Sequence, residues 1–105
     1  KALVARGHGN LGWMDLLSRN FTDSISHSLA ALKYDSQQDW IHLNLASAYV
    51  CNSQYDEARV IYTRLQEASK DPGAFRTTIE EEFLNLESNG ITHPDMERIL
   101  KELDP

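Results

Sequence analysis

The sequence predicts an all-α protein in which helical hairpins stack side by side. In the stretch from Trp40 to Leu65, small and large apolar residues alternate at the spacing of two interlocking antiparallel helices. The chain also repeats itself with a period of about 34 residues, and helix-start residues precede most of the predicted helices. These observations predict about six helices and no convincing strand, arranged as two repeats and a degenerate capping repeat.

The repeat is clearest in two fragments, HGNLG at 8–12 and HLNLA at 42–46. The shift that superimposes these fragments also aligns Phe21 with Tyr55, and a third copy begins in register near Ile79. We therefore expect one domain over 1–105, divided into repeats at about 1–36, 37–72 and 73–105.

Helix boundaries follow from start and stop residues in chain order. After an opening helix, three pairs resemble capping boxes: Asn20 with Asp23, Ser36 with Asp39, and Ser53 with Asp56. Pro72 after Asp71 marks another start, Gly90 a helix end, and His93 with Pro94 a last start. The predicted helices are about 2–18, 21–34, 37–52, 54–69, 72–89 and 94–103.

The last third departs from the repeat in the way that the end of a stack requires. Glu80 stands where the earlier copies have Gly12 and Ala46, so a partner helix could not approach as closely there. Together with Glu81, Glu82 and Glu87 it predicts a solvated acidic face on a terminal cap, with a cation-binding or basic-peptide site as the alternative interpretation.

Composition narrows the classes of partner. The formal charge of −6 arises in residues 71–105, where nine acidic residues face three basic ones. This leaves no basic footprint for nucleic acid, and no apolar run approaches the length of a membrane span. Cys51 lies in an apolar run and is expected to be a buried structural thiol. The chain begins at Lys1, as a fragment or processed chain would; a cytoplasmic location is slightly favoured, and a removed signal peptide is the alternative.

The second hairpin resembles a tetratricopeptide repeat, a family with a period of about 34 residues. The residues that carry the resemblance are Leu45, Ala46, Tyr49, Ser53, Tyr55, Ala58, Tyr62, Leu65 and Pro72. The first copy departs from the pattern, because Asp15 and Ser28 stand where aromatic residues are usual. The closing segment at 83–103 is similar to endings of bacterial tetratricopeptide proteins.

This resemblance implies a concave groove, lined by the first helix of each hairpin, that holds a peptide or a partner's helix. The groove positions implied are Arg6, Gly9, Asn10, Trp13, Trp40, Leu43, Asn44, Ser47, Ala74, Thr77, Thr78 and Glu81. The family's best-known chemistry is a basic clamp for a peptide C-terminus. Because Gly9, Trp13, Ala74 and Thr78 occupy clamp positions and only Asn44 fits, we expect a groove of another kind.

Four of these side chains have two interpretations each. Trp13 and Trp40 are candidate interface anchors, or they pack between neighbouring helices. Asn10 and Asn44 share one register of the repeat and are candidates to hold a peptide backbone, or to bond to a neighbouring helix.

Metal binding and catalysis find little support. No two of His8, His27, His42 and His93 have the one-turn spacing of paired helical ligands. No phosphate loop, nucleophile elbow or pairing of nucleophile and base is recognisable. We expect no enzyme activity, no cofactor and no metal.

The sequence therefore favours a non-catalytic protein-interaction module, a scaffold or adaptor that binds another protein or a peptide. The main alternative is self-assembly or stacking in a longer protein through the N-terminal hairpin, where Ala2, Leu3 and Val4 form an apolar start. A minor alternative is an accessory domain of an enzyme.

Overall fold

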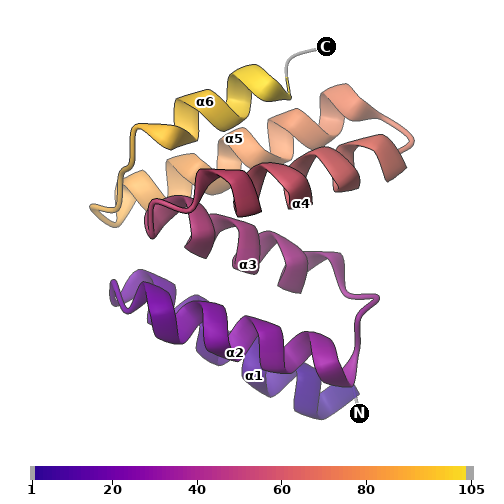
Figure 1. The fold of residues 1–105 in the computed structure, drawn as a ribbon, viewed down its shortest axis with the longest axis vertical. Coiled ribbons are helices and arrows are strands. Elements are labelled where there is room, and N and C mark those ends of the chain that lie inside the picture. Colours follow the sequence, from indigo (N-terminus) through magenta and orange to yellow (C-terminus); the bar gives the residue numbers. More distant parts are fainter. Residues whose placement is uncertain (1, 104–105) are drawn as a thin grey trace.

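The computed structural model describes residues 2–103, which form six helices and no strand within that range. The helices are α1 (Ala2–Leu17), α2 (Phe21–Tyr34), α3 (Asp39–Cys51), α4 (Tyr55–Ala68), α5 (Pro72–Ser88) and α6 (Asp95–Glu102). Along the longest axis of the molecule, α1 and α2 lie at one end, α5 and α6 lie at the other, and α3 and α4 lie between them (Figure 1). The all-α class and the number of helices predicted from the sequence are confirmed.

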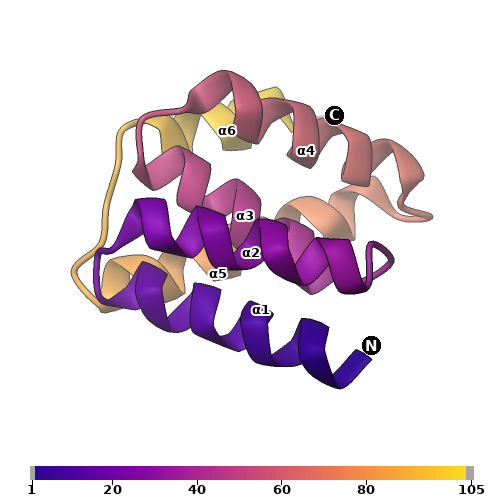
Figure 2. The ribbon, with the colours of Figure 1, turned by 60° about the horizontal axis from the view of Figure 1, so that its bottom comes forward.

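Consecutive helices pack against each other as antiparallel neighbours. α1 and α2 lie side by side (Figure 2), and α2 in turn contacts α3, which contacts α4. α3 is the central element: besides its two chain neighbours it contacts α1 and α6. Eight of its residues are buried, including Ile41, Leu45 and Val50. The first helix of the stretch from Trp40 to Leu65 therefore lies at the centre of the fold.

Three helices end in the same type of turn. The residues at these ends, Arg19, Ser53 and Gly90, have positive φ angles of 67°, 62° and 79°. Each donates its N–H to the carbonyl three residues back, and each following residue donates to the carbonyl five back, which is the Schellman pattern. Arg19 and Ser53 occupy equivalent positions of the sequence repeat, whereas Gly90 falls beyond the next equivalent position because α5 is longer.

Most of the residues that the sequence predicts as helix caps make no capping hydrogen bond. Asn20 precedes α2 but makes no capping hydrogen bond, and α3 and α4 begin after Gln38 and Gln54 rather than at Ser36 and Ser53. Near α3 it is Asp35 that accepts hydrogen bonds, from the Gln37 backbone and the Gln38 side chain. Asp71 caps as expected, because its carboxylate accepts from the Ala74 N–H at 3.1 Å, and at the start of α6 His93 Nδ1 accepts from the Asp95 N–H at 3.0 Å.

Small residues set the close approach of the paired helices. In the first pair the Ser24 hydroxyl donates to the Gly12 carbonyl at 2.6 Å, and a Cβ on Gly12 would lie 2.7 Å from Ser28 Oγ. In the second pair Ala46 and Ala58 are fully buried. The alignment of these small positions in the sequence therefore corresponds to equivalent packing.

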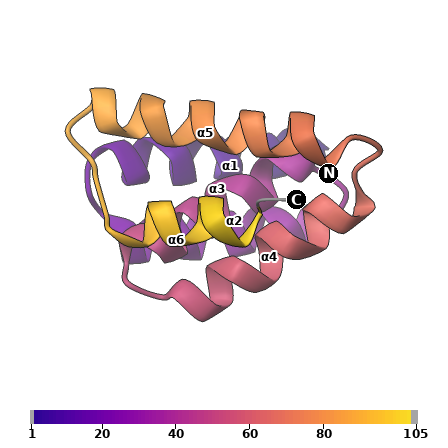
Figure 3. The ribbon, with the colours of Figure 1, turned by 90° about the horizontal axis from the view of Figure 1, so that it is seen from above.

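α6 closes the end of the molecule by lying between α4 and α5 (Figure 3). Met96, Ile99 and Leu103 are buried against the core. The Arg19 guanidinium, in the turn between α1 and α2, donates to the carbonyls of Asn89 and Gly90, in the turn between α5 and α6. These hydrogen bonds connect the first turn of the chain to the last.

Candidate functional site

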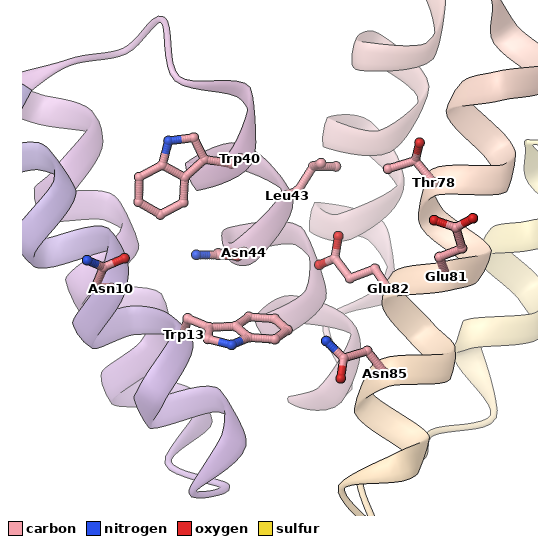
Figure 4. A pocket seen from close by; sticks show the side chains of 9 residues that line it. All are labelled: Asn10, Trp13, Trp40, Leu43, Asn44, Thr78, Glu81, Glu82 and Asn85. Carbon is pink, nitrogen blue, oxygen red and sulfur yellow. The ribbon is translucent and has the colours of Figure 1, made fainter.

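A pocket of about 450 Å³ opens between α1, α3 and α5 (Figure 4). These are the first helices of the three pairs, which is where the sequence places the groove. The residues that line the pocket are Asn10, Trp13, Trp40, Leu43, Asn44, Thr78, Glu81, Glu82 and Asn85. It therefore gathers side chains from three segments that are far apart along the chain.

Two tryptophans form opposite walls of the pocket (Figure 4). Trp40 is 38% exposed and lies over Gly9, where a Cβ would come within 2.5 Å of the ring atom Cη2. Trp13 is half-buried and packs against the hydrophobic core. Each tryptophan thus packs against the protein, as one interpretation predicts, and also presents aromatic surface to the pocket, so a role as an interface anchor stays a prediction.

The two asparagines that share a repeat position differ in environment. Asn44 is buried, and its Nδ2 donates to the Gly9 carbonyl of α1 at 3.3 Å. Asn10 is exposed at the mouth of the pocket. Asn44 therefore has the structural role of bonding a neighbouring helix, whereas Asn10 is accessible to a ligand.

Glu82 does not belong to the solvated face that the sequence predicts for the glutamates. Its Oε1 accepts a hydrogen bond of 2.6 Å from the hydroxyl of Ser47, which is fully buried in α3. Ser47 Oγ also lies 2.9 Å from the Tyr62 hydroxyl, which donates to it when Ser47 donates to Glu82. The register of α5 turns Glu82 inward while Glu81, one residue earlier, stays exposed.

Burial perturbs the ionisable groups of this polar cluster. It raises the pKa of Glu82 from 4.5 to about 7, although the hydrogen bond from Ser47 favours the ionised form. Burial, and then the charge of Glu82, raises the pKa of Cys51 to about 11 and also raises the pKa of Tyr62. Cys51 is therefore a protonated, buried thiol near neutral pH, as the sequence predicts.

Five of the groove positions that the resemblance implies do not line the pocket: Arg6, Gly9, Ser47, Ala74 and Thr77. Arg6, Ala74 and Thr77 are exposed outside it, Gly9 is buried against the Trp40 ring, and Ser47 is fully buried in α3. Glu82 and Asn85 line it without having been predicted. Thr78, Glu81, Glu82 and Asn85 follow the i, i+3, i+4, i+7 spacing of one helix face, so the helical period carried one turn further would have found them.

Two of the four histidines, His8 and His27, lie in the first pair of helices, whereas His42 is on α3 and His93 precedes α6. His8 stacks on His27 and Tyr34, and His27 Nδ1 lies 2.5 Å from the Asp15 carboxylate. Within the part of the chain that the structure describes, no three histidine, cysteine or acidic side chains are placed to hold a metal ion.

The electrostatic character of the pocket is acidic. Glu81 and Glu82 line it, and no lysine or arginine among the described residues does so. None of the described helices is long and apolar enough to cross a membrane. Comparison of the chain with family models, with curated proteins and with solved structures found no match.

Proposed function

We propose that the chain is a non-catalytic protein-interaction module of tetratricopeptide type that binds a peptide or a partner's helix in the groove between α1, α3 and α5. The observation that carries this proposal is the pocket itself. It brings together Asn10, Trp13, Trp40, Leu43, Asn44 and Glu81, which the sequence assigns to a binding groove from three separate segments.

Two structural features that recur with the sequence repeat support the tetratricopeptide type. The Schellman turns at Arg19 and Ser53 recur with the spacing of the sequence repeat. The interlocked pairs of helices use small residues at equivalent positions, Gly12 and Ala46. A third pair of modified length follows them, with α5 supplying the third wall of the groove.

The lining favours a protein segment as the ligand. Tryptophans supply large contact areas at a small loss of conformational entropy, and surrounding amides can satisfy the backbone groups of an extended segment. A carboxylate-binding clamp would need cations in the groove, whereas this groove presents Glu81 and Glu82.

The test is affinity capture with the purified chain and its Trp40→Ala variant, using extract from the cells that produce the protein. Leu84→Ala is the matched control, because Leu84 is an exposed apolar residue of α5 that does not line the pocket. We expect the Trp40 variant to lose a partner that the wild-type and Leu84 variant retain. Retention of every partner by a folded Trp40→Ala protein would contradict the proposal.

A second candidate function, self-assembly or stacking in a longer protein, is favoured by one face of α1. Leu3, Leu11 and Met14 lie within one stripe of that helix and are 77%, 45% and 61% exposed. The side chains of Ala2 and Val4, which the sequence assigns to the same surface, lie outside the described residues. Sedimentation that shows association in the wild-type and a monomer in a Leu11→Glu, Met14→Glu variant would support this role; a strict monomer at all concentrations would exclude self-association.

A further inference from the structure

We propose that the pocket between Trp13 and Trp40 receives an arginine side chain from the bound segment, with the Glu82 carboxylate as its counter-charge. This inference rests on the proposed groove function and specifies the chemistry that the groove selects. The observation behind it is that the Glu82 carboxylate lies in a pocket with two tryptophans and has no positively charged partner among the described residues.

The Glu82 side chain is held in place by a hydrogen bond to only one of its two carboxylate oxygens. Glu82 Oε1 accepts from Ser47, whereas Oε2 has no protein partner among the described residues and is open to the pocket, where a ligand can reach it. An ionised carboxylate that is largely removed from water is costly unless a cation or several donors accompany it. A bound cation at Oε2 would supply that missing partner.

No lysine or arginine among the residues that the structure describes supplies the cation. The groups that face the Glu82 carboxyl are the hydroxyls of Ser47 and Tyr62 and the Cys51 thiol, with Glu81 beside it on the same helix. Arg76, the arginine of the same helix, is turned away and bonds Glu80 and the Leu100 carbonyl. The ionised form of Glu82 therefore has no cation of the described residues beside it, and a cation from a ligand would balance it.

The walls distinguish a guanidinium from an ammonium group. A planar guanidinium stacks on an indole face while it donates along its edge to a carboxylate, and it carries five N–H donors. Trp13 and Trp40 offer aromatic surface, and carbonyl acceptors are offered by the exposed amides of Asn85, on the same helix as Glu82, and of Asn10, across the pocket on α1 (Figure 4). The Asn85 oxygen also accepts from Asn89 at 3.4 Å. A lysine ammonium could also pair with the carboxylate, but it cannot stack on an indole face as a planar group and has fewer N–H donors for the amide carbonyls.

Protonation provides an independent signature of this contact. Because burial raises the pKa of Glu82 to about 7, part of the population is protonated at neutral pH. A guanidinium at Oε2 favours the ionised carboxylate, so binding should release a proton near pH 7. Binding should also tighten as the pH rises through this range.

The experiment is an NMR titration of the 105-residue chain with the capped peptide acetyl-Gly-Ser-Arg-Ser-Gly-amide, following the indole N–H signals of Trp13 and Trp40. The same peptide with citrulline, a neutral isostere of arginine, isolates the charge; the same peptide with lysine isolates the planar group. We expect binding of the arginine peptide to exceed that of the citrulline peptide by about tenfold, the factor that corresponds to one charge-assisted contact of about 1.4 kcal/mol.

The Glu82→Gln variant should remove most of this preference and the proton release, whereas Glu87→Gln, which removes an exposed charge of the same helix outside the pocket, should retain both. Equal binding of arginine and citrulline peptides, or no shift of either indole at ~10 mM peptide, would overturn the inference. Equal binding of arginine and lysine peptides would overturn the assignment to a guanidinium. The citrulline comparison uses the wild-type protein, so it decides the matter even if the Glu82 variant does not fold.

Failure here can be told apart from failure of the proposed function. If capture shows a partner that depends on Trp40 but the arginine peptides show no preference, the groove binds a segment by other chemistry. If no partner depends on Trp40, the proposed function itself is contradicted.

Discussion

Replacing Glu82 by glutamine should stabilise the protein at alkaline pH and have little effect at acid pH. Glutamine keeps the size of the side chain and an oxygen that can accept from Ser47, which donates to Glu82 Oε1 at 2.6 Å. It removes only the charge. The change therefore isolates the cost of ionising this carboxyl in the folded protein.

The magnitude follows from the shift of the pKa from 4.5 to about 7, which burial causes. Since the folded protein binds this proton more tightly than the unfolded chain, the associated stability is fully present below pH 4.5 and is lost as the pH rises through about 7. At about 1.36 kcal/mol for each pH unit, the ionised carboxylate lowers the free energy of unfolding by roughly 3 kcal/mol above that range.

The assay is urea unfolding of the wild-type and Glu82→Gln proteins at about pH 4.5 and about pH 8. We expect the variant to be more stable by roughly 3 kcal/mol at the higher pH and by less than ~1 kcal/mol at the lower pH. Glu81→Gln, which removes a charge from the exposed neighbour, should change the stability by less than ~0.5 kcal/mol at both. A difference between wild-type and Glu82→Gln that does not vary with pH, or a less stable variant at pH 8, would refute this account of the buried carboxyl.

Three further substitutions probe the packing. Gly9→Ala should be less stable than Gly7→Ala by about 1–3 kcal/mol, because both gain helix propensity but only a Cβ at Gly9 meets the Trp40 ring, at 2.5 Å; equal urea midpoints would contradict the contact. Gly90→Ala should lose roughly 1–2 kcal/mol because φ is +79° there, and an unchanged midpoint would argue against that turn. Ile99→Ala should lose about 2–5 kcal/mol in thermal or urea unfolding if α6 covers the core, and a loss below ~1 kcal/mol would show that it does not.

The helices could be predicted from the sequence because local signals agreed with each other. The apolar periodicity together with the start and stop residues placed every helix within two residues of its observed bounds, and α2 at its observed residues. Pro72 and Gly90 marked a start and an end through their own backbone chemistry, and the paired small residues Gly12 and Ala46 located the close helix contacts. Such signals depend only on residues close together in the sequence, so they can be interpreted without knowledge of the tertiary structure.

The capping residues and the left-handed turns could not be predicted in the same way. Ser53 and Arg19 adopt positive φ angles although neither is glycine, because tertiary contacts hold them there. The Ser53 hydroxyl bonds His93 and the Arg19 guanidinium bonds the Gly90 carbonyl, partners that are 40 and 71 residues away. A capping rule that uses four consecutive residues cannot anticipate these bonds.

The sequence indicated where the pocket lies but missed two of the residues that line it, Glu82 and Asn85. The resemblance to tetratricopeptide repeats implied a groove along the first helix of each pair, and most of the residues that line the pocket are among the positions it implied. The burial of Glu82 depends on the distance between α3 and α5, through its bond to Ser47, and composition makes a run of three glutamates look solvated. Arg6 and Thr77 lie on these helices but point away from the pocket, which only the rotation of each helix decides.

The most direct test of the binding groove is site-specific photo-crosslinking in the cells that produce the protein. A photoreactive phenylalanine analogue would replace either Asn85, which lines the pocket, or Leu84, which is exposed on the same helix outside it. The account predicts a cross-linked protein segment from position 85 and none from position 84, with the cross-link lost in the Trp40→Ala background. No cross-link at position 85, or the same products from both positions, would contradict a partner-binding groove between α1, α3 and α5.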